Sequence, residues 1–155
     1  MGNTIPKGVQ AVTPFSAQKY LGTWYEIARF DFCFERGLSK TTANYSMNGD
    51  GSIKVLNRGY DAAGGKWKEV TGNAKFVGST DVAMLKVSFF GPFYAGYNVV
   101  AIDNQYRYAL VIGKNIDYMW LLSREKNMPQ EVLDRYIAIA QKIGFDTSRL
   151  IWVEQ

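Results

Sequence analysis

The stretch YLGTWYEIARF, residues 20–30, places a glycine two residues before a tryptophan at the start of an expected strand. Glycine weakens a strand, because it has no side chain to pack and loses much backbone entropy. Tryptophan is large, and its indole N–H needs a hydrogen-bond partner when it is buried. The pairing therefore indicates a strand start at which the tryptophan closes off something that the rest of the chain builds.

The composition narrows the class of protein. A chain of 155 residues favours one domain, and its 10 Tyr, 9 Phe and 4 Trp suit strands and apolar cavities. The net charge of +4 comes from dispersed lysines and arginines, so we expect no nucleic-acid partner. The absence of histidine excludes Ser-His-Asp and Cys-His catalytic sites and removes the commonest metal ligand. We expect no metal, no cofactor and no enzymatic activity.

Eight strand-like runs follow one another at short spacing, and turn signals such as the NGDGS of residues 48–52 separate most of them. Turns of hairpin length favour an antiparallel meander over parallel βαβ units. Closure into a barrel would leave no exposed strand edges, and eight strands leave room for one small ligand. The expected strands cover residues 24–30, 41–47, 52–60, 68–77, 83–89, 97–103, 106–112 and 118–123.

The segment NMPQEVLDRYIAIAQKIGF, residues 127–145, has helical periodicity. Its apolar residues recur at helical spacing, Pro129 suits the first turn, and Gly144 suits the position after the last. A helix with one apolar face should pack on the outside of the barrel. A short run at residues 149–155 suits an edge strand. We therefore predict an all-β fold, with residues 1–19 as an N-terminal arm and residues 20–155 as a single domain.

These features resemble the lipocalin family. Gly22 and Trp24 match its Gly-x-Trp motif, Arg124 matches the single arginine after the eighth strand, and AIDNQYRYAL partly matches the corner motif between them. The resemblance implies an eight-stranded antiparallel up-and-down barrel with one C-terminal α-helix packed outside. Arg124 would then stack on Trp24 at the closed end, and Gly22 would let the arm turn tightly across that end.

Four longer strings, YLGTWYEIARFD, FERGL, LKVSFFGPFY and GYNV, resemble the bacterial outer-membrane lipocalins. That resemblance implies a lipoprotein of the outer membrane or periplasm that binds a fatty acid or lysophospholipid and maintains envelope lipids. It also implies homodimers. No run approaches the roughly 20 apolar residues of a membrane span, so we expect the chain as given to be soluble, without the lipoprotein signal.

Period-two alternation, helped by the family pattern, predicts which strand residues face the ligand. The inward set is mostly apolar and aromatic, as a site for an acyl chain requires. Tyr45 and Asn57 are the expected headgroup anchors. The predicted ligand-binding residues are Ala28, Phe30, Tyr45, Val55, Asn57, Phe76, Val87, Phe89, Tyr97, Val99, Tyr118, Trp120 and Leu122.

Two alternatives to ligand storage or transport remain open. The first is a lipid-modifying enzyme that uses the single cysteine, Cys33, although an inert loop thiol is the favoured interpretation because no histidine can activate it. The second is an interaction protein whose barrel is filled by its own side chains. An inward carboxylate at Glu26 is costly unless it is paired, and we expect a structural hydrogen bond to a tyrosine or an arginine.

Aromatic residues also gather in the expected loops at the open end. Phe32 and Phe34 flank Cys33, and the segment FGPFY at residues 90–94 contributes a second group. An apolar rim at the mouth of the barrel would touch a membrane surface or a second subunit.

Overall fold

The strands form one closed antiparallel barrel in a computed structural model that describes residues 4–32 and 35–155, apart from the side chain of Phe90. Consecutive strands pair from β2 to β8, and β1 pairs with both β8 and β2, which closes the sheet. The predicted eight-stranded fold is confirmed. The strands are β1 (Gly22–Arg29), β2 (Leu38–Met47), β3 (Ile53–Asp61), β4 (Lys66–Phe76), β5 (Met84–Phe90), β6 (Phe93–Ile102), β7 (Tyr108–Ile112), β8 (Met119–Ser123) and β9 (Ile151–Trp152).

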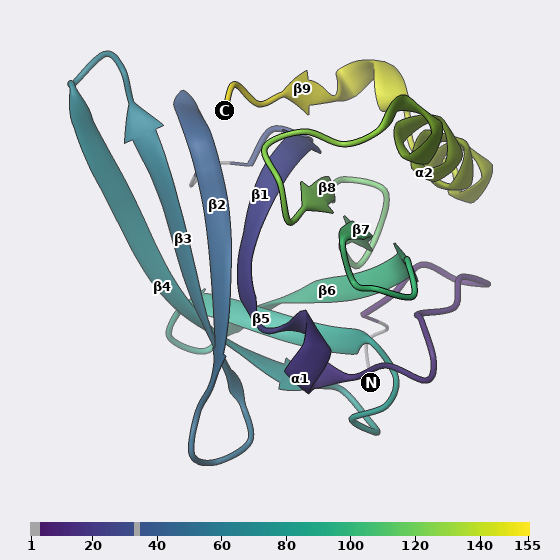
Figure 1. Cartoon of the computed structure of the whole chain (residues 1–155). Coiled ribbons are helices and arrows are strands. Elements are labelled where there is room, and N and C mark those ends of the chain that lie inside the picture. The colour runs from purple at the N-terminus through teal and green to yellow at the C-terminus, as the bar shows by residue number, and fades with distance from the viewer. Residues whose placement is uncertain (1–3, 33–34) are drawn as a thin grey trace.

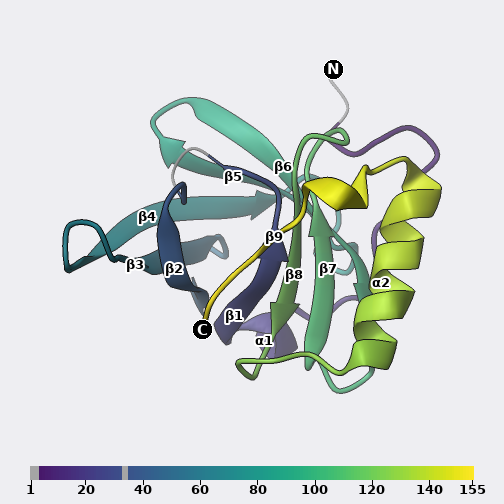
Figure 2. The same ribbon diagram turned by 90° about the horizontal axis from the view of Figure 1, so that it is seen from above.

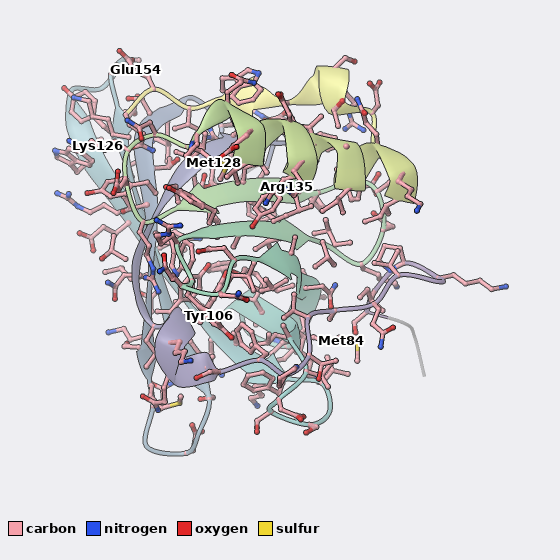
Figure 3. All side chains as sticks on the ribbon, turned by 45° about the vertical axis from the view of Figure 1, so that its right-hand side comes forward. Met84, Tyr106, Lys126, Met128, Arg135 and Glu154 are labelled. Carbon is pink, nitrogen blue, oxygen red and sulfur yellow. The ribbon has the colours of Figure 1, made fainter. Side chains whose placement is uncertain are left out.

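The helix α2 (Gln130–Ile143) lies outside the barrel against β7 and β8 (Figures 1 and 2). Its buried residues Val132, Tyr136 and Ala140 join a second apolar core between the helix and the barrel wall. Met128, just before the helix, belongs to the same core and lies beside the start of α2 in Figure 3. The amphipathic pattern of the sequence therefore predicted the helix and the face that it buries correctly.

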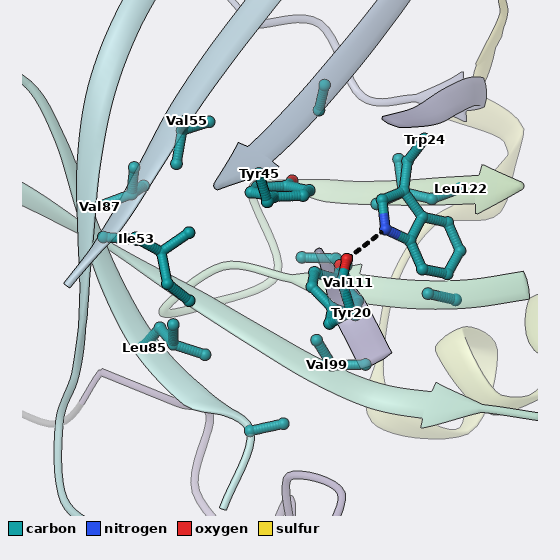
Figure 4. Close-up of a cluster of buried hydrophobic side chains, with 14 of the residues drawn as sticks. Tyr20, Trp24, Tyr45, Ile53, Val55, Leu85, Val87, Val99, Val111 and Leu122 are labelled. Carbon is teal, nitrogen blue, oxygen red and sulfur yellow. Dashed lines mark hydrogen bonds between the residues drawn. The ribbon is translucent and has the colours of Figure 1, made fainter. Parts of the chain in front are cut away.

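The closed end is built by the chain that precedes β1. The short helix α1 (Ala17–Tyr20) crosses this end, and Ala11 and Phe15 of the arm are buried in the barrel core. The Trp24 indole N–H donates to the Tyr20 carbonyl at 2.9 Å, as the dashed line in Figure 4 shows. Trp24 is fully buried. The arm and the tryptophan together seal this end of the barrel.

The opposite part of the seam between β1 and β2 is filled by the C-terminal segment. β1 pairs with β2 only over residues 22–25, and further along it pairs with β9 instead. The Gln155 side-chain amide donates to the carbonyls of Glu26 (2.7 Å) and Thr41 (2.9 Å), one on each strand. The predicted edge strand is thus present, and it satisfies backbone groups that the divergence of β1 and β2 would leave unpaired.

The structure corrects the predicted facing of Ala28 on β1 and of Phe30 just after it. The register of β1 against β8 shifts between Glu26 and Ala28, which indicates a bulge. Glu26 faces the interior, but Ala28 and Phe30 lie in the outer core beneath α2, where Phe30 meets Phe145 edge to face at 5.7 Å. The prediction that Ala28 and Phe30 face the ligand is therefore wrong, because the bulge resets the alternation.

Candidate functional site

The interior of the barrel holds a cavity of about 630 Å³. Strands β1, β2, β3, β5, β6 and β8 contribute to its wall, together with Thr4 of the arm and the segments that follow β1 and β7. A volume of this order is in the range of sites for small organic ligands. The lining residues are Thr4, Glu26, Phe32, Glu35, Ala43, Tyr45, Val55, Asn57, Lys86, Val87, Phe89, Phe93, Tyr94, Ala95, Gly96, Tyr97, Gly113, Lys114, Asn115, Tyr118, Trp120 and Leu122.

Most of the predicted ligand-binding residues lie together on this wall. They are Tyr45, Val55, Asn57, Val87, Phe89, Tyr97, Tyr118, Trp120 and Leu122. Phe76 and Val99 belong to the barrel core, but neither lines the cavity. Phe76 lies against Phe15 of the arm, with ring centroids 6.3 Å apart. These two residues therefore support the end of the barrel, and with Ala28 and Phe30 they fall outside the cavity wall.

Three tyrosine hydroxyls form a buried network inside the barrel. Tyr97 shares a hydrogen bond of 2.6 Å with Tyr45 and another of 2.6 Å with Tyr20. Burial raises the pKa of each phenol above its ordinary value, so all three stay neutral at physiological pH. Figure 4 shows Tyr45 and Tyr20 near Trp24, with Val55 and Val87 on another part of the wall. Tyr45 is thus already engaged by protein partners.

A second polar cluster lies on the cavity wall around Glu26. Its carboxylate accepts a hydrogen bond from the Thr41 hydroxyl at 3.0 Å and lies 3.7 Å from the Arg29 guanidinium. Glu35 lies 3.8 Å from the same guanidinium and accepts from the Trp120 indole N–H at 3.1 Å. Burial and the neighbouring Glu35 carboxyl raise the pKa of Glu26 well above its ordinary value. The expected hydrogen bond from a tyrosine or an arginine is therefore wrong, because Thr41 donates to Glu26 and Arg29 lies opposite it only in an ion pair.

Glu35 is a site residue that the sequence reasoning missed. It belongs to the segment between β1 and β2, which the expected strands left as a loop, yet its side chain is buried on the cavity wall. Alternation within strands could not place it, because residues in an irregular segment have no period. The nearest signal in the sequence is the acidic residue of the string FERGL, which resembles the bacterial outer-membrane lipocalins.

The lining also includes apolar groups that are exposed to solvent. Phe93 is 77% exposed, and Tyr94 and Tyr118 are also exposed. Phe32 packs edge to face on Tyr118 and on Trp120. The predicted rim residues Phe32 and Phe93 therefore both belong to the cavity wall. Phe34 and Cys33 lie outside the described residues.

The described residues offer little other chemistry. No group of three or more cysteine, aspartate or glutamate side chains gathers there as a metal site. In the same part of the chain, no helix has the length and apolar character needed to cross a lipid bilayer.

Comparison with known families agrees with this geometry. A family model for the lipocalin-like domain matches residues 15–155. The chain belongs to the lipocalin family, whose members bind small hydrophobic ligands and are generally binding or transport proteins. The structure agrees with this assignment in three features: the closed barrel, the external helix, and the contact of Arg124 with Trp24 at the closed end.

Individual bacterial proteins are similar to nearly the whole chain. The chain is 54% identical over 152 residues to the outer membrane lipoprotein Blc of Escherichia coli K12. The match covers 98% of this chain and 86% of that protein. It is 52% identical over 153 residues to the Blc of Vibrio cholerae, covering 97% and 89%. Among solved structures, insecticyanin from the tobacco hornworm matches with a TM-score of 0.76 at 20% identity, covering 100% of this chain and 88% of the other. That structure supports the fold alone.

Proposed function

We propose that the protein stores or carries a single-chain lipid, a fatty acid or lysophospholipid, with the acyl chain buried in the barrel cavity. The observation that carries this proposal is a cavity of about 630 Å³ whose wall combines apolar side chains with few polar groups. Each methylene that leaves water contributes about 0.8 kcal/mol, so a long chain binds without many specific polar contacts.

The polarity of the wall suggests how such a lipid lies. Apolar residues such as Ala43, Val55 and Leu122 suit the acyl chain, whereas Lys86 and Lys114 are cations among the lining residues. Lys114 follows β7 and is exposed to solvent. An anionic headgroup is therefore best placed near Lys114, where water and a lysine both stabilise its charge.

The similarity to outer membrane lipoproteins supports a role in the bacterial envelope. We infer that the protein works at the outer membrane or in the periplasm and maintains envelope lipids. The exposed aromatic residues Phe93 and Tyr94 would touch a membrane surface there, or a second subunit in a homodimer. Both partners suit a carrier that must load and unload an apolar ligand without exposing it to water.

A titration tests the proposal, because Trp120 lies on the cavity wall and reports occupancy through its emission. Long-chain fatty acids and lysophospholipids should change that emission and saturate at micromolar concentrations. Native mass spectrometry of protein purified from its own host should show co-purified lipid. If the emission does not change and no lipid co-purifies, an interaction protein whose barrel is filled by its own side chains is the better account. If the protein converts the lipid and alkylation of Cys33 abolishes that turnover, the lipid-modifying enzyme is favoured instead.

A further inference from the structure

Two lysines lie directly opposite each other on the outer face of the barrel. Lys75 of β4 and Lys86 of β5 are register partners, and the residues on either side of each lysine belong to the barrel core. Their Nζ atoms lie 5.7 Å and 5.0 Å from the centre of one ring, that of Tyr94. On β3, Lys54 is the register partner of Asn73, two residues before Lys75, and lies on the same face. We call the three lysines and Tyr94 the lysine patch.

The lysine patch has little compensation for its charge within the protein. Like charges at opposed positions of neighbouring strands destabilise a sheet. No carboxylate of the described residues lies within ion-pair distance of any of the three lysines. Hydrogen bonds from Ser52, and to a smaller extent the charge of Lys75, lower the pKa of Asp50, which is exposed. The patch therefore keeps an excess of positive charge, and an anionic partner would stabilise it.

An open pocket of about 430 Å³ lies on this outer face. Its wall includes Lys54 and Tyr94 together with the polar side chains of Asn48 and Asn73. The Oδ1 atom of Asn73 accepts hydrogen bonds from Asn48 (2.9 Å) and Ser52 (3.1 Å), whereas no described residue accepts one from its Nδ2 atom. An ammonium group and an amide N–H in one pocket are suitable donors to the oxygens of a phosphate group.

The lysine patch adjoins the mouth of the barrel. Lys86 and Tyr94 line the cavity as well, and Phe93, on the β5–β6 hairpin beside them, is 77% exposed. Cations next to an exposed aromatic residue suit an anionic bilayer, where the lysines meet phosphates and the aromatic ring enters the apolar layer. A second copy of the chain suits the patch less well, because a symmetric contact would set lysines against lysines.

We propose that the lysine patch is a docking surface for the phosphate headgroups of an anionic membrane. The inference rests on the proposed envelope role and adds to it the face of the barrel that meets the bilayer and the charge of the lipids there. Phosphate groups supply the counter-charge that the described residues do not provide around Lys75 and Lys86. Docking on this face brings the mouth of the cavity to the membrane surface, where a lipid enters or leaves.

Vesicles that differ only in charge test the docking surface. The probes are phosphatidylcholine vesicles with and without phosphatidylglycerol, and cosedimentation measures the affinity of the wild-type protein at low and at physiological ionic strength. We expect the anionic vesicles to bind at least about tenfold more tightly than the neutral ones, because each lysine near the surface contributes about fivefold. The preference should shrink at the higher ionic strength, since salt screens the attraction.

Three single variants assign this preference to the patch. Lys54→Gln and Lys75→Gln should each reduce the preference for anionic vesicles about fivefold. Neither lysine lines the cavity, so both variants should bind fatty acids in solution as the wild type does. Lys142→Gln removes the same charge from an exposed position on α2, on the other side of the barrel from β4 (Figure 2), and should change the preference less than about twofold.

A charge reversal separates docking from a structural role. In Lys75→Glu the new carboxylate pairs with Lys86, so the melting temperature should stay equal or rise while the preference for anionic vesicles falls further than in Lys75→Gln. A lower melting temperature with an unchanged preference would assign Lys75 to barrel stability and overturn the proposal.

Three other results decide between docking and its alternatives. Equal binding of both vesicles by the wild type would overturn the proposal, and so would Lys54→Gln and Lys75→Gln variants that behave like Lys142→Gln. A change in self-association without a change in vesicle binding would assign the patch to a second copy and overturn it too. If fatty acids fail to bind in solution while anionic vesicles are still preferred, the lipid-carrying function is contradicted and the docking surface is supported.

Discussion

The guanidinium of Arg124 lies 3.9 Å from the centre of the Trp24 ring, in a cation–π contact across the closed end of the barrel. Its three nitrogens donate to the carbonyls of Tyr106 (3.1 Å), Thr23 (3.0 Å) and Lys19 (2.9 Å). One side chain therefore ties the β6–β7 connection, β1 and α1 to the tryptophan. The contact joins residues a hundred positions apart, and it explains why the chain carries a tryptophan at the start of its first strand.

Removal of this arginine should destabilise the barrel. Arg124→Ala loses three hydrogen bonds to carbonyls and the cation–π contact, so we expect the free energy of unfolding to fall by roughly 2–4 kcal/mol. Arg135→Ala, which removes an exposed arginine of α2, should change it by less than about 0.5 kcal/mol. Urea denaturation measures both. Equal effects of the two variants would contradict the role given to Arg124.

Trp24→Ala should cost stability first and affinity only as a consequence. Truncation of a buried tryptophan typically costs about 3–5 kcal/mol, and Trp24 is not among the cavity-lining residues. We therefore expect a large fall in the melting temperature, with a ligand affinity within about twofold of wild type once the folded fraction is taken into account. A loss of affinity in fully folded Trp24→Ala would show that the tryptophan acts on the ligand directly.

Gly22 is a position where a side chain is excluded twice. Its φ angle is +100°, and a Cβ atom there would lie 3.3 Å from Nη1 of Arg124. Gly22→Ala should lower the free energy of unfolding by roughly 1–3 kcal/mol, through backbone strain and displacement of the guanidinium. Gly78→Ala is the matched control, because its added Cβ would meet nothing within 4 Å. The expectation fails if both alanines are tolerated equally.

The raised pKa of Glu26 predicts a pH-dependent stability. Below its ordinary value of 4.5, the carboxyl is protonated in both folded and unfolded chains and imposes no penalty. As the pH rises, the unfolded chain releases the proton first, so Glu26 increasingly destabilises the fold until the pH passes its folded pKa. The unfolding free energy of Glu26→Gln, minus that of wild type, should therefore increase between pH 4 and pH 8.

Urea denaturation across this pH range measures the difference. Glu26→Gln also removes the carboxyl group that faces Arg29, Glu35 and Thr41, which shifts the unfolding free energy by a constant amount. The slope of the difference with pH is therefore the quantity to compare. Glu125→Gln, in an exposed position, should give a difference that stays nearly flat. A flat difference for Glu26→Gln as well would mean that Glu26 ionises in the folded barrel as readily as in the unfolded chain.

The exposed aromatic residues on the cavity margin predict contact with a membrane. Phe93 is 77% exposed on the short β5–β6 hairpin, and its transfer into lipid would remove apolar surface from water. Phe93→Ser should weaken sedimentation with vesicles of outer-membrane lipid composition at least severalfold. Val77→Ser, an exposed apolar residue after β4, serves as the control. If dimerisation is lost instead of vesicle binding, a second subunit is the partner of this surface.

The sequence predicted the architecture well because its signals were local and periodic. Turn residues marked the hairpins, helical spacing marked α2, and Gly22, Trp24 and Arg124 marked the closed end. The alternation failed from Ala28 onward, because the apolar residues Ala28 and Phe30 give no sign of the bulge that turns them toward α2. Periodicity describes regular strands only, and a bulge interrupts it.

The remaining features depended on contacts between distant segments. No periodicity in the sequence places Glu35 beside Arg29, or Gln155 between β1 and β2. The sequence predicts residues 1–19 as an arm outside the single domain, yet Ala11 and Phe15 are buried in the barrel core. Such placements follow from how the whole barrel closes, so a reading of one stretch at a time does not reach them.

The most direct test of the central claim compares lipid binding by the wild-type protein with binding by a variant whose cavity is filled by a larger side chain. Isothermal titration of wild type with oleoyl lysophospholipid should saturate at one lipid per chain, with micromolar affinity or better. Val55→Phe, which points a larger side chain into the cavity, should weaken binding at least tenfold, whereas Lys54→Phe on the outer face of the same strand should not. Undiminished binding by folded Val55→Phe, or no saturable binding by wild type, would contradict the assignment of the cavity as the lipid site.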